Sequence, residues 1–269
     1  MRTKSLAAPY IVWMVIFTVV PLAMVAYFAF TTSSGEFTLA NMARASEYLP
    51  VLLRSVWYAL AACVICLIIG YPVAYVIAQT SASTQRVLYL LVTLPMCMSF
   101  LLRTLAWVAL LRDTGIINTL LAGLGIGPLP LIRNAGSVIM GMVYTYLPYM
   151  IMPLYTVISK LDPRLIEAAQ DLGCDSAQVF RRVVLPLSMP GIVSGITMVF
   201  VPAVSTFYIS QKLGGTNNTM IGDVIELQFK GSLNRNFGAA MSLVLMVLVF
   251  VSIWLMNRFT DDEEGVATI

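Results

Sequence analysis

The sequence predicts an all-α polytopic membrane protein that forms a single transmembrane domain over residues 1–269. Hydrophobic residues make up 59% of the chain and charged residues only 11%, a balance too apolar for a soluble domain of this length. A helix needs roughly 20 apolar residues to cross a bilayer. Six runs reach that length, and Arg103 is the only charged residue in the interior of any of them. The six predicted spans are residues 9–30, 56–79, 87–111, 137–159, 187–209 and 238–258.

The first span follows the basic start Met1-Arg2-Thr3-Lys4, which leaves a cleaved signal peptide as the competing interpretation. The apolar run is longer than a usual signal-peptide core and no small-x-small site ends it, which favours an uncleaved span. With six spans both termini lie on one side. Placing them in the cytoplasm divides the 16 basic residues evenly between the two sides, so only the basic N-terminus favours that orientation.

Two features of the second and third spans resemble functional sites. Cys63-x-x-Cys66 has the spacing of a redox or zinc motif, but it lies in an apolar run without a second ligand pair, which favours helix packing. Arg103 lies about 8 residues, roughly 12 Å of helix rise, from the outer end of its span. Its side chain has two options, to extend to the membrane surface or to point into the bundle.

Proline occurs in five of the six spans. It removes a backbone hydrogen bond and kinks a helix, which suits a bundle that opens a path. Gly191-x-x-x-Gly195 predicts a face for close helix packing in the fifth span. The prolines are Pro21, Pro72, Pro95, Pro148, Pro153, Pro190 and Pro202.

Two connections contain short helices. Residues 112–136 predict an apolar helix followed by a Gly/Pro turn. Residues 210–237 predict a Gly-Gly turn and then a helix that carries Asp223 and Glu226. These two carboxylates are three residues apart and therefore share one helix face.

The longest polar stretch with clear helix signals is residues 160–186, between the fourth and fifth spans. Asp162 is suited to cap a helix that begins at Pro163, and Gly173 is suited to end it. Asp175 or Ser176 caps a second short helix, which Leu185-Pro186 ends. Two charged helices on a membrane protein predict a docking site for a soluble partner.

The sequence lacks the usual catalytic and metal-binding groups. Histidine is absent, which removes Ser-His and Cys-His catalysis and the commonest metal ligand. No G-x-x-x-x-G-K-[ST] phosphate-binding loop occurs. We therefore assign no catalytic residue and no metal site.

The spacing Glu167-Ala168-Ala169, Gly173 and Leu185-Pro186 resembles the E-A-A-x3-G-x9-I-x-L-P signature of the membrane subunits of ATP-binding-cassette importers. The one departure is Val183 in place of isoleucine. Within that superfamily the chain is similar to spermidine/putrescine permeases over about residues 85–258. The similarity is carried by the stretches 103–118, 144–155 and 207–223.

This resemblance implies a type I importer permease fold and a place in the bacterial cytoplasmic (inner) membrane, with both termini cytoplasmic. It implies an ABC ATPase dimer that binds ATP and Mg²⁺, so the chain itself is not an enzyme and holds no cofactor. It also implies a second, related membrane subunit and a periplasmic or surface substrate-binding protein as partners, and no nucleic acid.

The resemblance also assigns roles within the coupling segment, residues 160–186. Glu167, with Arg181 and Arg182, makes the docking contacts to the ATPase. The small residues Ala168, Ala169 and Gly173 let the turn enter the groove of the ATPase. Leu185 and Pro186 connect the second short helix to the fifth span.

A polyamine crossing the bundle would favour carboxylates or aromatic faces. Since no span has a carboxylate, the candidates for the substrate path are aromatic residues together with the two acidic residues of the last connection. They are Trp107, Tyr146, Tyr149, Tyr208, Asp223 and Glu226.

Three alternatives remain open on the sequence. The first is the same permease role for a different small solute. The second is a membrane-anchored helix-turn-helix DNA-binding protein, although the coupling segment has three arginines against four carboxylates. The third is a secondary transporter, which would lack an obvious proton or sodium site.

Overall fold

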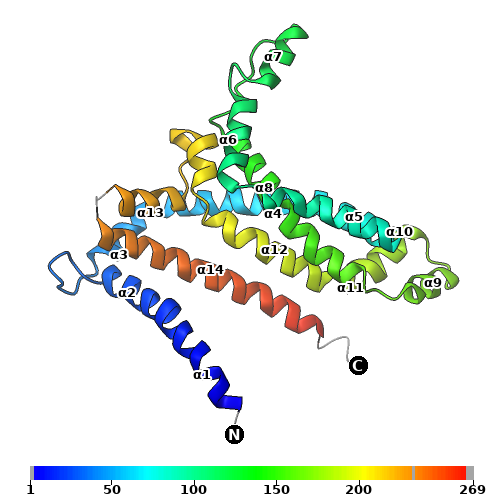
Figure 1. Cartoon of the computed structure of the whole chain (residues 1–269), viewed down its shortest axis with the longest axis horizontal. Coiled ribbons are helices and arrows are strands. Elements are labelled where there is room, and N and C mark those ends of the chain that lie inside the picture. The colour runs from blue at the N-terminus through cyan, green and yellow to red at the C-terminus, as the bar shows by residue number, and fades with distance from the viewer. Residues whose placement is uncertain (1–2, 232–233, 265–269) are drawn as a thin grey trace.

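The computed structural model describes residues 3–231 and 234–264, and its regular structure within these ranges is helical (Figure 1). One isolated bridge joins Thr31 and Phe37. The main helices are α1 (Thr3–Met14), α2 (Val20–Ala29), α3 (Ala40–Ala45), α4 (Leu49–Gln79), α5 (Ala82–Thr93), α6 (Phe100–Leu111), α7 (Ile116–Gly123), α8 (Ala135–Ile158), α9 (Pro163–Asp171), α10 (Ser176–Val179), α11 (Leu185–Leu187), α12 (Met189–Val204), α13 (Ile221–Lys230) and α14 (Arg235–Glu264).

The centre of the fold is the bundle of α4, α8 and α12, which run side by side (Figure 1). A Cβ on Gly191 would lie 3.1 Å from Val157 Cβ, and one on Gly195 would lie 2.6 Å from Met150 Sδ. Glycine at these positions lets α12 approach α8 closely, which confirms the packing face predicted from Gly191-x-x-x-Gly195. Cys63 and Cys66 are free thiols buried in α4, where they pack against α12 and α8.

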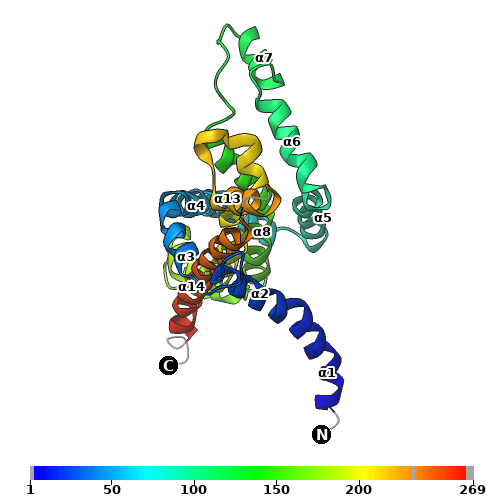
Figure 2. The same ribbon diagram turned by 90° about the vertical axis from the view of Figure 1, so that its left-hand side faces the viewer.

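The last helix, α14, packs against α2 through small side chains. Ala29, Ala239 and Ala240 form one buried cluster at this contact. The Asn236 side chain donates hydrogen bonds to the carbonyl oxygens of Phe28 (3.1 Å) and Thr31 (2.7 Å). Beyond this contact α1 and α2 diverge from the bundle, and α1 begins on the same lower side on which α14 ends (Figures 1 and 2).

Four helical segments have the length and composition of membrane spans: Pro9–Ala29, Ala40–Gln79, Ala135–Ile158 and Arg235–Met256. The other two predicted spans are bent helix pairs, so the described residues supply up to six spans if each pair is one span. The third and fifth predicted spans, 87–111 and 187–209, each overlap a helix pair with a sharp bend. Helix α6 turns 88° away from α5 after an extended Met98, and α12 turns 63° at Ser188 and ends at Val204.

Proline accounts for the break positions, because it cannot donate the hydrogen bond that continues a helix. Pro95 lies in the 3-10 turn Leu94–Cys97 just before the 88° bend, and Pro186 and Pro190 flank Ser188. Wide π-turns precede two prolines, at Val15–Val19 before Pro21 and at Phe180–Val184 before Pro186. By contrast α4 and α8 each contain proline and remain single helices.

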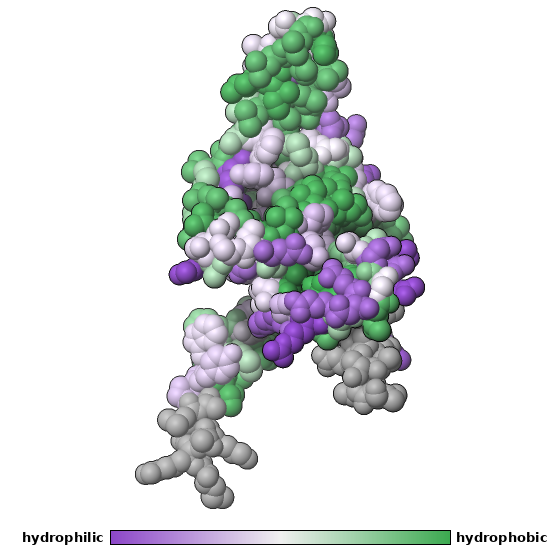
Figure 3. Space-filling model, turned by 90° about the vertical axis from the view of Figure 1, so that its right-hand side faces the viewer, coloured by the Kyte–Doolittle hydropathy of each residue, from purple (hydrophilic) through white to green (hydrophobic). Residues whose placement is uncertain are grey.

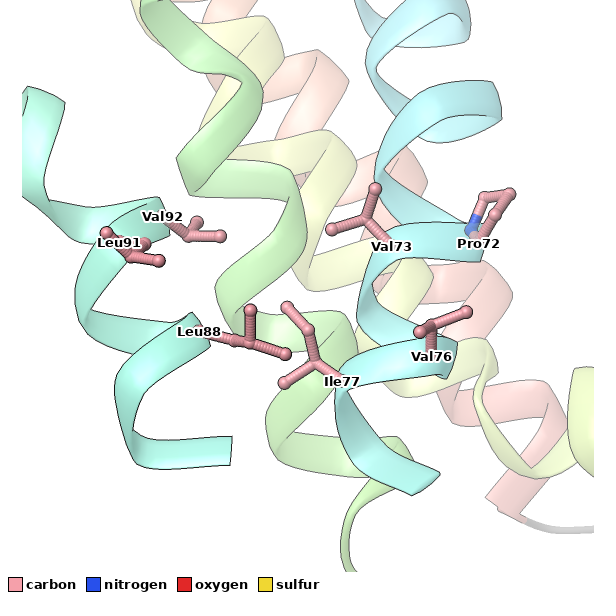
Figure 4. A pocket seen from close by; sticks show the side chains of 7 residues that line it. All are labelled: Pro72, Val73, Val76, Ile77, Leu88, Leu91 and Val92. Atoms are coloured by element: carbon pink, nitrogen blue, oxygen red, sulfur yellow. The ribbon is translucent and has the colours of Figure 1, made fainter. Parts of the chain in front are cut away.

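A groove between α4 and α5 separates the third span from the bundle (Figure 4). Its lining side chains are all apolar, so none of them offers a hydrogen-bonding group to a polar solute. They are Pro72, Val73, Val76, Ile77, Leu88, Leu91 and Val92.

Gly195→Val is expected to destabilise the protein, because the new side chain would collide with Met150 across the contact between α8 and α12. Overpacking of this kind costs about 1–3 kcal/mol, and each kcal/mol lowers Tm by about 2–4 °C in a chain of this size. Gly123→Val is the matched control, since a Cβ there meets nothing within 4 Å. Thermal unfolding in detergent is the measurement, and equal losses of Tm in the two variants would contradict the role of Gly195.

Candidate functional site

The coupling segment folds as its capping residues predict. The Asp162 carboxylate accepts a hydrogen bond from the backbone N–H of Arg164 (3.0 Å) at the start of α9. Gly173 has φ of +84°, the left-handed conformation that ends a helix most easily with glycine. Asp175 caps α10 by accepting from the Gln178 N–H (2.7 Å), and Gln178 accepts in return from the Asp175 N–H. The two-helix prediction is therefore confirmed, with Asp175 as the second cap.

The apex of this segment presents apolar as well as charged groups to the outside. Leu172 is 87% exposed beside Gly173, and Leu165 is also exposed. Leu172 was not among the residues predicted from the sequence. The signal that could have indicated it is an apolar residue on a polar helix, directly before the glycine that ends the helix. Among the predicted site residues, Glu167, Ala168, Gly173, Arg181, Arg182 and Pro186 are exposed, whereas Ala169 and Leu185 are half-buried.

The second half of the segment is anchored to the bundle by aromatic contacts that sequence analysis did not foresee. The Phe180 ring meets the rings of Tyr71 and Tyr75 of α4 edge-on, with centroids 5.5 and 6.0 Å apart. The Tyr71 and Ser188 hydroxyls are hydrogen-bonded at 2.7 Å, at the point where the fifth span bends. Phe180 and Ser188 thus connect the coupling segment to both α4 and α12.

The predicted path aromatics lie in separate pairs. Trp107 contacts Tyr144 edge-on at 5.3 Å between centroids, and Tyr146 lies 6.3 Å from Tyr149. Tyr146 is buried, and its hydroxyl donates to the carbonyl oxygen of Pro202 (3.2 Å). Tyr208 has Phe100 on one side (5.9 Å) and the Lys212 ammonium 5.6 Å from its ring centroid.

Arg103 points into the protein and not to the membrane surface. The residue is 8% exposed, and its Nε and Nη1 have no hydrogen-bond acceptor among the residues that the structure describes. A buried guanidinium without acceptors is costly. Of the two options for this side chain, the inward one is therefore realised.

Asp223 and Glu226 share one face of α13, as predicted, but both carboxylates have partners within the chain. Asp223 accepts from the Ser210 hydroxyl (2.9 Å) and from the Met220 N–H (2.7 Å), so it caps its own helix. Glu226 pairs with Lys230 and accepts from the Gln211 side chain. In this conformation neither residue presents an unoccupied carboxylate to a cation.

The environments of these two acids move their pKa values in opposite directions. Burial raises the pKa of Asp223 to about 6, against the lowering effect of its hydrogen bonds from Met220 and Ser210. Desolvation acts in the same direction on Glu226, but hydrogen bonds from Lys230 and Gln211 outweigh it and lower the pKa of that carboxyl. Asp223 is therefore the group of this site that titrates just below neutral pH.

Asp223 is expected to make stability depend on pH. Its carboxyl binds a proton more tightly in the folded chain, so its contribution is complete below about pH 4 and is lost as the pH rises through about 6. Asp223→Asn keeps an acceptor for the Met220 N–H and a donor for Ser210 but does not ionise. As the pH rises from about 4 to 6, the Tm of the asparagine variant should therefore increase relative to that of the wild type. Parallel pH profiles of Tm for the two proteins would contradict this assignment. Asp223→Ala loses both hydrogen bonds and should be less stable than the wild type at every pH in this range.

Comparison with known proteins shows the family of the chain. Residues 67–262 match the family described as the binding-protein-dependent transport system inner membrane component. The chain is 38% identical to the spermidine/putrescine transport system permease protein PotB of Haemophilus influenzae, over 91% of this chain and 90% of that protein. It is 37% identical to the protein of the same name in Escherichia coli, over 93% and 96% of the two chains.

Solved structures support the fold independently. A bacterial ABC transporter involved in the import of the acidic polysaccharide alginate superposes with a TM-score of 0.76 at 17% identity, over 97% of this chain and 95% of that chain. The MetNI methionine ABC transporter superposes with a TM-score of 0.55 at 19% identity, over 83% and 99% of the two chains. At such identities the likeness concerns the type I importer permease fold alone. The chain belongs to the family of binding-protein-dependent transport system inner membrane components, multi-pass permease proteins of the bacterial inner membrane.

Proposed function

We propose that the chain is the membrane-spanning permease subunit of an ATP-driven importer of polyamines, fed by a soluble substrate-binding protein. The observation that carries this proposal is the similarity to the spermidine/putrescine permease protein of E. coli, which extends over more than nine-tenths of this chain and of that protein. A permease role for another small solute is the alternative, because a coupling segment is common to importers of different cargo.

The coupling segment supports the ATPase as partner. It combines an exposed polar surface with the 87% exposed Leu172, and it lies at one end of the bundle (Figure 1). Hydrophilic residues gather on the face of the molecule on that side (Figure 3). A separate ATPase dimer, which binds ATP and Mg²⁺, would receive this segment in a groove on each subunit. This proposal places the segment and both termini in the cytoplasm.

The individual roles follow from exposure and contacts. Glu167, Arg181 and Arg182 are exposed and free to contact the ATPase, while Ala168 and Gly173 keep the apex narrow. Leu185 is half-buried against the core and Pro186 lies at the entry to the bend at Ser188. Closure of the ATPase dimer would then pull on α12 and α4 and bias the bundle between two packings.

The substrate path is proposed along the aromatic faces of Trp107, Tyr146, Tyr149 and Tyr208. Aromatic rings attract cations through their faces without holding them as tightly as a carboxylate would. Asp223 and Glu226 would enter the path only after giving up their partners Ser210 and Lys230. Weak contacts suffice in the bundle, because the binding protein would perform the selection.

The cargo is tested with the purified complex in proteoliposomes. Binding protein loaded with spermidine or putrescine is expected to stimulate ATP hydrolysis above the level seen with unloaded protein. Stimulation by a different solute alone would replace the polyamine assignment and retain the permease role. The absence of any copurifying ATPase would refute both.

Leu172→Ser is expected to weaken binding of the ATPase, because it removes an apolar side chain that is exposed in the isolated chain and available to fill a groove. A loss of about 1.4 kcal/mol corresponds to a tenfold rise in Kd, measurable by titrating the detergent-purified permease with ATPase. The matched control is Phe37→Ser, which replaces a 75% exposed side chain in the connection between α2 and α3. Equal effects of the two substitutions would count against the apex as the docking point.

A further inference from the structure

Helices α6 and α7 form an arm that stands away from the bundle, and both views show it projecting (Figures 1 and 2). The arm begins at the 88° bend after α5 and meets the bundle at its root, where α6 lies against α8 and the π-helix Ser210–Gly214. Its helices α6 and α7 have 12 and 8 residues, which correspond to rises of roughly 18 and 12 Å. Since packed helices lie about 8–10 Å apart, each of them is long enough to cross a helix of a neighbour.

The arm is held in a fixed shape by hydrogen bonds at its far end. The buried Asn118 side chain donates to the carbonyl oxygens of Arg112 (3.3 Å) and Leu129 (3.0 Å) and accepts from the Leu129 N–H (3.0 Å). These bonds tie α7 both to the elbow before it and to the returning chain. Gly115 is needed at the elbow, because a Cβ there would lie 2.4 Å from the Leu110 carbonyl oxygen. The arm is thus preformed, which lowers the entropic cost of binding a partner.

The exposed surface of the arm is apolar. Ile116, Leu120 and Leu124 are 62%, 66% and 77% exposed and, at a spacing of four residues, form one stripe. Leu101, Leu102 and Leu105 of α6 are exposed as well. In the space-filling view the upper lobe of the molecule is almost entirely hydrophobic (Figure 3). Contact with water would therefore be unfavourable along these apolar faces of α6 and α7.

Lipid is an equally poor environment for this arm. The elbow carries the exposed charges of Arg112 and Asp113, and residues 125–134, which return to the bundle, are not helical. Irregular backbone at membrane depth is tolerated where protein or a watery cavity covers it. Helix α7 also lacks the basic polar face of helices that lie at the lipid surface, since it contains no charged residue. A protein surface satisfies all of these requirements together.

We propose that the α6–α7 arm is a clasp that lies on the second membrane subunit of the importer, with the stripe of Ile116, Leu120 and Leu124 seated between two of its helices. The inference rests on the proposed function and on the second, related membrane subunit that the family resemblance implies. A helix that lays its apolar face into a hydrophobic groove is a common mode of recognition. The partner surface is therefore an apolar groove between helices that has an acceptor for Arg112 and a donor for Asp113 near the elbow.

The test places a photo-crosslinking benzoylphenylalanine at Leu120 or at Leu124 in the assembled importer in native membranes. Adducts with the second membrane subunit, identified by mass spectrometry, are the expected result at both positions. The control is the same probe at Ile117, which is half-buried and packs against the chain's own core, so its adducts should be intramolecular. Adducts confined to lipid or to the substrate-binding protein, or no adduct beyond the control level, would overturn the clasp.

A second variant tests the contact without a probe. Leu120→Ser combined with Leu124→Ser should reduce the second membrane subunit that copurifies with this chain at least tenfold, with unchanged amounts of this chain in the membrane. Unchanged copurification would contradict the proposal. If the unmodified chain retains neither a second membrane subunit nor an ATPase, the proposed function fails; if it retains both and the arm makes no adduct, only the clasp fails.

Discussion

Close helix contact through glycine is the constraint on which the rest of this structure depends. In a bilayer the hydrophobic effect does not drive helices together, so van der Waals contact between small residues has to do so. Gly191 and Gly195 bring α12 against Val157 and Met150 of α8. Gly70 does the same for α4, since a Cβ added there would lie 3.1 Å from Met150 Cγ. The three helices form a closely packed unit, from which the coupling segment, α13 and the arm extend.

Hydropathy and capping rules predicted which segments are helical but not the direction in which they run. The caps Asp162 and Asp175, the turn at Gly173 and the short helices α7 and α13 all follow from local residue chemistry, and local chemistry is visible in the sequence. Pro95 marks the place where the third span breaks, but it does not predict the 88° angle of the bend after Met98, because an apolar helix has the same composition whether it lies along the membrane normal or across it. The contacts of Phe180 with α4 and of Asp223 with Ser210 were missed since they join elements that only the tertiary fold brings together.

Two buried charged side chains show opposite solutions to the cost of burial. Asp223 is compensated by two hydrogen bonds and ties α13 to the chain that follows α12. Arg103 has no acceptor for two of its donor nitrogens among the described residues, so its burial is not compensated within the chain as it stands. A cation on the proposed path would therefore meet aromatic faces and an inward positive charge, and it would meet no unoccupied carboxylate on α13. On that path, strong selection for a polycation would have to come from outside this chain.

The two sharp bends have related consequences for how such a subunit works. Each interrupts a span beside proline, and each directs a segment away from the rigid bundle: the bend at Ser188 joins the fifth span to the coupling helices, and the bend after Met98 starts the arm. A bundle packed through glycine does not deform gradually, because its interlocked side chains permit discrete arrangements and resist intermediate ones. In the proposed mechanism, force applied at the coupling helices would be passed on to α4 and α12 through the contacts of Phe180 and Ser188. If the arm holds the second membrane subunit, the same closely packed bundle would transmit that displacement across the interface, and the two halves of the path would move together.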